Sequence, residues 1–462
     1  MNQWSIDKEI SVSKTFMLSF ALTLMFSACG CGPPPKPVEA IQASSESAEA
    51  PAIELSETDW PWWRGAQRSG AATMQEIPAE WAAGDVTWSQ QISGLGHSSP
   101  IVVGNQVIVT TADEGAQTQS ILSFDRVTGK PAWKVSYEGR FVRMHRKNSH
   151  ASATAATDGH HIFVPFVHDD ALFLHAVTMD GQKAWSTNVG PFQSEHGYGS
   201  SPVIFESLVI VNGDSRGQGY EAAIHRGTGE IAWRTPRNSG KGHGSYASPI
   251  VANLAGRDQV IQPGLKRVTS YDPHTGEELW YVDGPAEVQS NSVAYQDPYV
   301  IATGGYPEKE VFCIKADGSG NVTDSHIVWR ESRSAPYVPS PMIYKGQVLC
   351  LTDNGVLASY GLDDGKRQWQ ERLSGNFSAS LTQVGELFLT SSEEGETLTF
   401  RVGESGIENL VRNQIGQDEF LATPVVSGGQ IYLRSKTHLY CIGSGKSAQA
   451  AESALSASSN ES

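Results

Sequence analysis

One pattern of apolar and polar positions recurs along most of this chain. Each copy begins with a short apolar run after serine and proline, as in Ser98-Ser-Pro-Ile-Val-Val103, and two further apolar runs follow. A last run carries a tryptophan and comes after a turn of aspartate and glycine, as in Asp272-Pro-His-Thr-Gly-Glu-Glu-Leu-Trp280. The aspartate of such a turn caps backbone donors, and the glycine adopts the left-handed conformation that other residues resist. Each copy therefore predicts four short β-strands.

The tryptophans set the period of the repeat. They are separated by 45, 52, 48, 47, 49 and 40 residues, at Trp88, Trp133, Trp185, Trp233, Trp280, Trp329 and Trp369. A period of roughly 40 to 50 residues with several strands per copy is typical of a propeller or a solenoid. Because a single cofactor would use only one tryptophan, we expect these repeated side chains to be structural and to pack one copy against the next.

The two ends of the repeat decide between those folds. Eight copies follow Ser98; the seventh, at 378–416, lacks the tryptophan, and the eighth ends after three strands. The missing strand is present before the first copy, at Asp85–Ile92. Such a strand closes a ring, whereas a solenoid needs capping units. We predict an all-β fold over 85–443, an eight-bladed β-propeller of four-stranded blades closed by pairing an N-terminal strand with the C-terminal blade.

The segments around the repeat differ from it in composition. Basic residues precede the apolar run 16–26, which is too short for a membrane span, and small residues then lead to Cys29. This predicts a lipoprotein-type signal peptide over 1–28 with Cys29 lipidated, or a secretory signal that is only cleaved. We further predict a disordered tether at 29–58, a Trp-rich lead-in packed on the propeller at 59–84, and a disordered tail at 444–462.

Charge and cysteine usage narrow the functional classes. The formal net charge of −16 argues against nucleic acid as a partner, because phosphates need a basic face. Cys313, Cys350 and Cys441 lie inside apolar runs, and their spacing fits neither a metal site nor a disulfide framework. We expect them to be buried free thiols.

The repeat resembles that of the pyrroloquinoline-quinone-like propeller family, whose signature is Asp-x-x-Thr-Gly-x-x-x-Trp in each of eight blades. That family includes quinoprotein alcohol dehydrogenases and the outer-membrane assembly lipoprotein BamB. Three other phrases look like the BamB-like lipoproteins of planctomycete bacteria: Asp59-Trp-Pro-Trp-Trp-Arg-Gly65, Met144-His-Arg-Lys-Asn-Ser-His-Ala-Ser152 and His196-Gly-Tyr-Gly-Ser-Ser-Pro202. The resemblance covers about 85–443 and implies the fold and an assembly role.

For a dehydrogenase, the same resemblance implies definite parts. A quinone lies between a tryptophan and a disulfide of two adjacent cysteines, and calcium is held by Glu, Asn and a catalytic Asp. This chain has no adjacent cysteine pair and no Cys-x-x-Cys-His haem motif. We therefore expect no pyrroloquinoline quinone or other cofactor, no metal and no catalytic residues.

Polar and aromatic residues cluster in the loops that enter the innermost strands. They are His97, Arg146, Asn148, His150, His196, Tyr198, His243, Tyr246 and Tyr337. Innermost strands line the channel of a propeller, so these loops should converge at one mouth and form a small-molecule or peptide site. Two other interpretations stay open. The side chains could cap strand ends, or the imidazoles could bind a metal at about 2.0–2.1 Å.

The sequence thus favours a non-catalytic envelope lipoprotein that acts as a protein-binding scaffold in outer-membrane protein assembly. We expect a monomer held by a lipid anchor, with envelope proteins as partners. The residue after the lipidated cysteine is Gly30. The absence of an aspartate at this position favours the outer membrane, on its periplasmic side. The alternative is a quinoprotein-like or other small-molecule or metal-binding enzyme that uses the histidine-lined channel mouth.

Overall fold

The computed structural model describes residues 38–43, 50–216, 218–238 and 244–443. They belong to one compact unit, Pro37–Ser462; the other unit, Met1–Lys36, lies outside the described residues, as do Cys29 and the predicted tail. The described chain is almost entirely β-strand, with one short 3₁₀ helix, η1 (Ala83–Asp85). No helix within it is long and apolar enough to cross a membrane.

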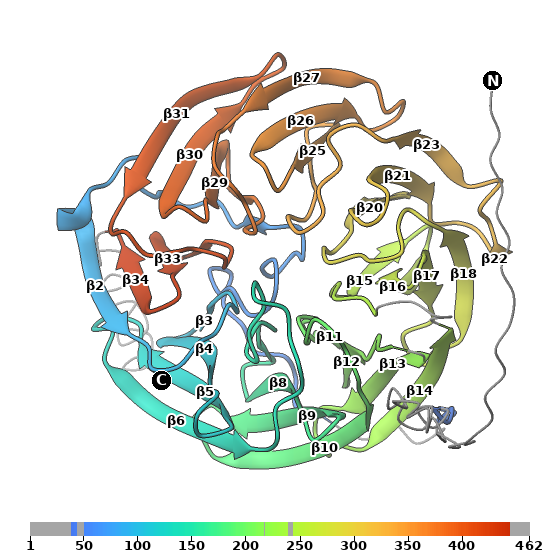
Figure 1. Cartoon of the computed structure of the whole chain (residues 1–462), viewed down its shortest axis with the longest axis horizontal. Helices are drawn as coiled ribbons and strands as arrows, with labels where there is room; N and C mark the ends of the chain where they lie inside the picture. The colour runs from blue at the N-terminus through green and yellow to red at the C-terminus, as the bar shows by residue number, and fades with distance from the viewer. Residues whose placement is uncertain (1–37, 44–49, 217, 239–243, 444–462) are drawn as a thin grey trace, which may run out of the picture. The chain divides into compact units, whose positions relative to one another are not determined.

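Eight antiparallel sheets of four main strands form a ring, which Figure 1 shows along its axis. The first four blades follow one another along the chain. Blade 1 has β3 (Ile101–Val103), β4 (Gln106–Asp113), β5 (Thr118–Asp125) and β6 (Pro131–Glu138). Blade 2 has β7 (Ala156–Thr157), β8 (His161–His168), β9 (Ala171–Thr178) and β10 (Lys183–Pro191). Blade 3 has β11 (Val203–Phe205), β12 (Leu208–Asn212), β13 (Gln218–His225) and β14 (Ile231–Asn238). Blade 4 has β15 (Ile250–Leu254), β16 (Arg257–Gly264), β17 (Arg267–Tyr271) and β18 (Glu278–Asp283).

The other four blades complete the ring. Blade 5 has β19 (Ala294–Gln296), β20 (Tyr299–Gly304), β21 (Glu310–Lys315) and β23 (Ile327–Glu331), and β22 (Gly320–Asn321) pairs in parallel with β18. Blade 6 has β24 (Met342–Tyr344), β25 (Gln347–Leu351), β26 (Val356–Gly361) and β27 (Arg367–Arg372). Blade 7 has β28 (Thr382–Val384), β29 (Leu387–Ser391), β30 (Glu396–Val402) and β31 (Ile407–Gln414). Blade 8 has β32 (Val425–Ser427), β33 (Gln430–Arg434), β34 (His438–Ile442) and β2 (Val86–Gln91).

The ring closes as the sequence predicts. Strand β2 pairs antiparallel with β34, and Trp88 lies opposite Cys441. The eight-bladed propeller and its closure by an N-terminal strand are therefore confirmed. Apolar layers fill the space between neighbouring sheets; one such layer joins Phe163 and Leu174 of blade 2 to Val209 and Ile224 of blade 3.

The seven repeat tryptophans lie on the outermost strands and contact the following blade. Five of them cover the turn glycine of that blade, in the pairs Trp88–Gly129, Trp133–Gly181, Trp185–Gly229, Trp233–Gly276 and Trp329–Gly365. Gly276 has φ +71°, and a Cβ there would lie 2.4 Å from the Trp233 ring, so only glycine fits both the turn and the contact. The indole N–H of Trp233 also donates to the carbonyl of Pro273 at 2.9 Å.

Two tryptophans depart from this rule. Trp280 and Trp369 donate instead to glutamines of their own blades, Gln259 at 2.7 Å and Gln347 at 3.0 Å. Trp280 faces blade 5, whose turn is longer, and Trp369 faces blade 7, which lacks the repeat tryptophan. Each departure thus occurs where the neighbouring blade has lost the regular turn.

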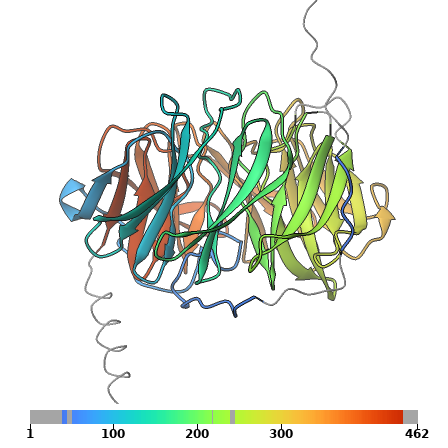
Figure 2. The same cartoon turned by 90° about the horizontal axis from the view of Figure 1, so that it is seen from below.

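The lead-in runs along the underside of the disc in Figure 2. Trp60 is buried and pairs with Val102 of blade 1 through two backbone hydrogen bonds, and Trp62 and Trp81 are buried as well. β1 (Ala71–Ala72) pairs in parallel with the innermost strand of blade 7. The segment therefore spans several blades from one side of the ring.

The segment predicted as a tether differs in part from that prediction, because some of it lies on the propeller. Ile41 pairs with Arg234 at the edge of blade 3. The Glu54 N–H donates to the Asp158 carbonyl at 2.9 Å. The Arg226 guanidinium, ion-paired with Asp158 at 2.5 Å, also donates to the carbonyl of Pro51. Composition suggested disorder here, but Arg226 and Arg234 of the propeller supply partners for the segment's backbone.

Candidate functional site

A ring of hydroxyl groups joins all eight blades around the axis. Each member precedes an innermost strand, at Ser99, Thr154, Ser201, Ser248, Ser292, Ser340, Ser380 and Thr423. In seven of the eight links, the backbone N–H of one member donates to the hydroxyl oxygen of the member in the next blade, at 2.8–3.1 Å. These bonds satisfy buried backbone donors where the innermost strands converge. The ring thus closes the propeller at its axis as the tryptophans do at its rim.

The eighth link is different, and the lead-in explains why. The Ser292 hydroxyl donates to the Ser248 carbonyl at 3.2 Å and accepts the indole N–H of Trp63 at 2.9 Å. Trp63 comes from the lead-in, so a residue outside the repeat supplies this connection at the axis. It forms part of the lining of the central cavity.

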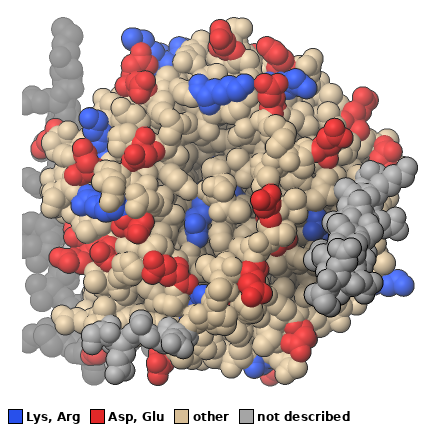
Figure 3. All heavy atoms as spheres, turned by 180° about the vertical axis from the view of Figure 1, so that it is seen from behind, with Lys and Arg blue, Asp and Glu red and all other residues tan. Residues whose placement is uncertain are grey.

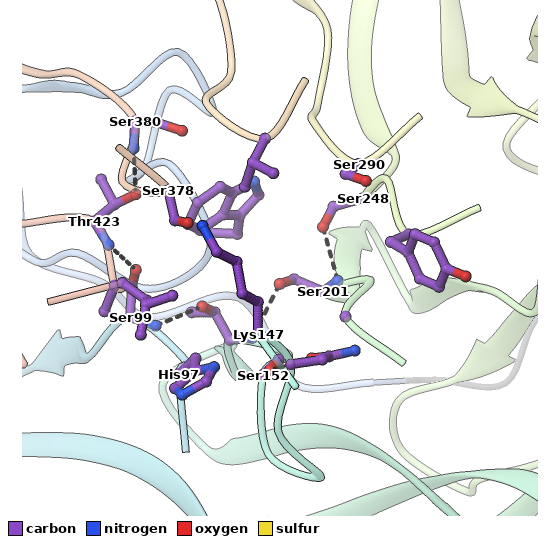
Figure 4. A pocket seen from close by; sticks show the side chains of 18 of the residues that line it. His97, Ser99, Lys147, Ser152, Ser201, Ser248, Ser290, Ser378, Ser380 and Thr423 are labelled. Atoms are coloured by element: carbon purple, nitrogen blue, oxygen red, sulfur yellow. Dashed lines mark hydrogen bonds between the residues drawn. The ribbon is translucent and has the colours of Figure 1, made fainter. Parts of the chain in front are cut away.

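This cavity has a volume of about 420 Å³ and lies at the axis of the ring. Figure 4 shows hydroxyl groups from successive blades around it, with the Lys147 side chain lying across it. Lys147 belongs to the loop between β6 and β7, and its ammonium pairs with Glu393 of blade 7 at 2.8 Å. Glu393 also accepts a hydrogen bond from Ser378 at 2.7 Å. This ion pair, which we call the strap, links the loop between blades 1 and 2 to blade 7.

His97 lines the cavity with both ring nitrogens buried. Neither nitrogen makes a hydrogen bond with the described residues, although the Lys147 backbone lies close enough to favour the charged form slightly. Burial and the positive charges of Arg434 and Lys436 lower the pKa of His97 to about 3. The imidazole is therefore neutral at physiological pH and adds no charge to the cavity wall.

Four other predicted residues line the same cavity. The Asn148 amide donates to the His196 carbonyl at 2.7 Å and so joins the loops of blades 2 and 3. The His196 ring lies 6.0 Å from that of Tyr246, and Tyr337 completes the aromatic part of the wall. The structure thus brings these four side chains and His97 together around one cavity.

The remaining predicted residues lie elsewhere. Arg146 is exposed and is not part of the cavity lining. His150 stacks on Phe141 with ring centroids 4.1 Å apart, and Tyr198 is buried with its hydroxyl donating to the Asn212 carbonyl at 3.0 Å. His150 and Tyr198 are structural in this arrangement, and His243 lies outside the described residues.

Several cavity residues were missed from the sequence. They are Trp63, Lys147, Asp353 and the ring hydroxyls other than Ser340. Asp353 accepts hydrogen bonds from the backbone of Tyr337 and Val338 at 2.9 and 3.1 Å, so its charge is held by the wall. For the hydroxyls a signal existed, because serine or threonine recurs before the innermost strand of every copy. The partners of Trp63 and Lys147 are 229 and 246 residues away and left no local signal.

The cavity does not match the calcium and quinone site of the dehydrogenases. Its lining holds a single carboxylate, Asp353, and no cysteine. The described cysteines, Cys313, Cys350 and Cys441, are free and buried in strands, and burial raises the pKa of each thiol to about 12. Across the described ranges, no three His, Cys, Asp or Glu side chains gather as a metal site.

Known proteins resemble the chain in sequence over most of the propeller. A family model described as outer membrane protein assembly factor BamB matches residues 75–195, 117–293 and 222–451. BamB of Yersinia pestis is 22% identical over 371 residues, which cover 76% of this chain and 86% of that protein. BamB of Shewanella oneidensis is 22% identical over 221 residues; the match covers 44% of this chain and 55% of the relative.

Solved structures show the same fold. BamB from Moraxella catarrhalis superposes with a TM-score of 0.55 at 14% identity, over 78% of this chain and 99% of that one. A europium-containing methanol dehydrogenase superposes with a TM-score of 0.61 at 10% identity, over 85% of this chain and 99% of the enzyme. At sequence identities this low, the superpositions show a shared fold and say nothing about activity.

Proposed function

This chain belongs to the family of the outer membrane protein assembly factor BamB, and from that premise we propose that it is a non-catalytic scaffold of the cell envelope. Its role is to bind envelope proteins during outer-membrane protein assembly. We further propose that Cys29 is lipidated and holds a monomeric propeller on the periplasmic side of the outer membrane.

The observation that carries the proposal is the double closure of the disc. The tryptophan contacts at the rim and the hydroxyl ring at the axis connect successive sheets, and the lead-in adds a further connection across several blades. A body held in this way presents its loops in fixed positions, which lowers the entropy cost of binding a partner. The face in Figure 3 carries interspersed acidic and basic side chains, which suits recognition through many local contacts.

The partner can be tested in the organism that encodes the chain. A photo-crosslinking amino acid placed at exposed loop positions such as Tyr306 is expected to trap components of the outer-membrane assembly machinery. Deletion of the gene should lower the amount of outer-membrane β-barrel proteins, and the intact gene should restore it. Unchanged β-barrel protein levels, together with crosslinks only to unrelated proteins, would refute the assembly role.

The anchor needs a separate test. Replacing Cys29 with alanine should move the protein from the membrane fraction to the soluble periplasm, while the wild type incorporates labelled fatty acid. Cys31→Ala serves as the matched control and should leave both properties unchanged. If Cys29→Ala stays in the membrane fraction and the wild type takes up no label, the proposed anchor is wrong.

The dehydrogenase alternative makes a different prediction. A quinoprotein would take up pyrroloquinoline quinone with calcium, show the visible absorbance of the cofactor and reduce an artificial electron acceptor with an alcohol. We expect none of these from the purified protein, because the cavity wall offers one carboxylate that is already held by two backbone N–H groups. Alcohol-dependent reduction above the rate of free quinone would replace the scaffold proposal.

A further inference from the structure

The central cavity retains hydrogen-bonding capacity that the fold does not use. Each ring hydroxyl that receives a backbone N–H keeps its own hydrogen and one further lone pair. Ser99, Thr154, Ser201, Ser248, Ser380 and Thr423 all line the cavity in this state. No acceptor for their hydroxyl hydrogens is found within the described chain. The wall therefore offers several groups that can each donate and accept.

The charges around the cavity are already compensated. Lys147 pairs with Glu393 in the strap, and Asp353 is held by two backbone N–H groups. His97 is neutral, and its ring lies at the edge of the same space. A cavity with this wall suits a ligand that is polar without net charge.

Aromatic side chains complete the lining. Trp63, Tyr246 and Tyr337 contribute rings to the wall, and the Trp63 ring is held in place by its bond to Ser292. Aromatic faces pack against the C–H faces of sugar rings, while alternating donors and acceptors match sugar hydroxyls. The volume of about 420 Å³ is at the small end of the range for ligand pockets, roughly 300–1,000 Å³.

We propose that the central cavity binds a neutral, hydroxyl-rich ligand of saccharide type, one or two rings in size. The ring hydroxyls bind its hydroxyl groups, Trp63 packs against one face, and the strap covers the mouth. The site is independent of the scaffold role, because it uses the inside of the channel and leaves the outer loops free.

An anion is the competing ligand chemistry. Arg434 is fully buried near His97, where it donates to the Ser98 and Thr110 carbonyls; among the described residues no carboxylate pairs with it. The Arg434 guanidinium does not line the cavity, however. Its positive charge instead helps to keep His97, which does line the cavity, neutral. Phosphate therefore belongs in the test as the ligand that the proposal excludes.

Saturation-transfer NMR and calorimetry on the full-length protein, in a detergent without a sugar head group, provide the test. The probes are glucose, N-acetylglucosamine, maltose and inorganic phosphate. At least one saccharide is expected to bind with a Kd of about 1 mM or tighter, and phosphate is not. Ser248→Ala removes a ring hydroxyl that lines the cavity and should weaken saccharide binding by about tenfold or more.

The matched control is Ser340→Ala. Ser340 belongs to the same hydroxyl ring and accepts the Ser292 N–H at 3.1 Å, but it does not line the cavity, so binding should be unchanged. Trp63→Leu is a second variant that should abolish binding while the circular dichroism spectrum is retained. The proposal is overturned if wild-type protein binds no saccharide, if phosphate alone binds, or if Ser248→Ala and Trp63→Leu fold and still bind with wild-type affinity.

Discussion

The rim and the axis of the propeller hold the same eight sheets together with different chemistry. At the rim the gap between neighbouring sheets is wide, and a tryptophan fills it by lying on the turn glycine of the next blade. At the axis the innermost strands crowd together, and a serine or threonine hydroxyl accepts a backbone N–H from its neighbour. The same ring of sheets therefore requires the largest side chain, tryptophan, at the rim, and small side chains, serine or threonine, at the axis.

The regular contacts of the two regions are also interrupted in different ways. Rim contacts change at Trp280 and Trp369, where the sequence of the next blade has itself departed from the repeat. The axial ring changes at Ser292, where Trp63 arrives from a segment outside the repeat. Rim irregularities are therefore local in sequence, whereas the axial one is imposed from a distance.

The largest effect on stability should come from the rim. Trp233 is fully buried and donates to blade 4, so Trp233→Ala should lower the free energy of unfolding by about 3–5 kcal/mol through loss of burial and a cavity between the sheets. Trp133→Ala is the comparison, because Trp133 is only half-buried in an equivalent position and should cost clearly less. Urea unfolding monitored by circular dichroism measures both, and equal losses would show that rim burial does not set the contribution.

The next largest effect on stability should come from Glu221, a buried acid between the rim and the axis, and this effect should depend on pH. Burial raises the pKa of Glu221 to about 8, with Asn212 donating to one oxygen at 3.1 Å, and the opposing charge of Arg237 does not reverse this shift. The ordinary value is 4.5, so between these two pH values the folded protein holds a proton that the unfolded chain has released. The free energy of unfolding should therefore fall as pH rises from about 5 to 8.

Glu221→Gln tests this contribution. The amide is neutral at every pH and can still accept the bond from Asn212, so the variant should have a melting temperature a few degrees above wild type at pH 9. Near pH 4, where Glu221 is protonated in both states, the two proteins should melt together. A constant difference across this pH range would mean that Glu221 does not titrate as described.

At the axis, the loss of one hydroxyl should have a smaller effect. Ser201→Ala removes the acceptor of the Thr154 N–H and should cost about 1–2 kcal/mol, since water in the cavity can replace part of the bond. Ser207→Ala changes a turn hydroxyl without a hydrogen bond in the described structure and should be neutral. Chemical denaturation again gives the numbers, and a cost at Ser201 above that at Trp233 would reverse the ranking of axis and rim.

The sequence predicted the rim far better than the axis, for physical reasons. A tryptophan and its turn lie a few residues apart in each copy, so period and closure could be predicted from Trp88 and the incomplete last blade. His97 and His150 occupy similar loop positions, yet one faces the cavity and the other stacks on Phe141. Side-chain direction in a loop depends on the path of the loop, which the spacing of residues does not encode.

The strap is the weakest of these contacts between blades, so its loss should have the smallest effect on stability. Lys147 is half-exposed, and an exposed ion pair contributes at most about 1 kcal/mol, so Lys147→Ala should leave the melting temperature almost unchanged. Lys345→Ala removes a surface ion pair with Glu386, between blades 6 and 7, and is the matched control. If Lys147→Ala unfolds much more readily than Lys345→Ala, the strap belongs with the hydroxyl ring as a third connection between blades. If both are neutral, the strap only covers the cavity mouth, and Lys147→Ala should let probe ligands associate and dissociate faster without weakening their contacts with the wall.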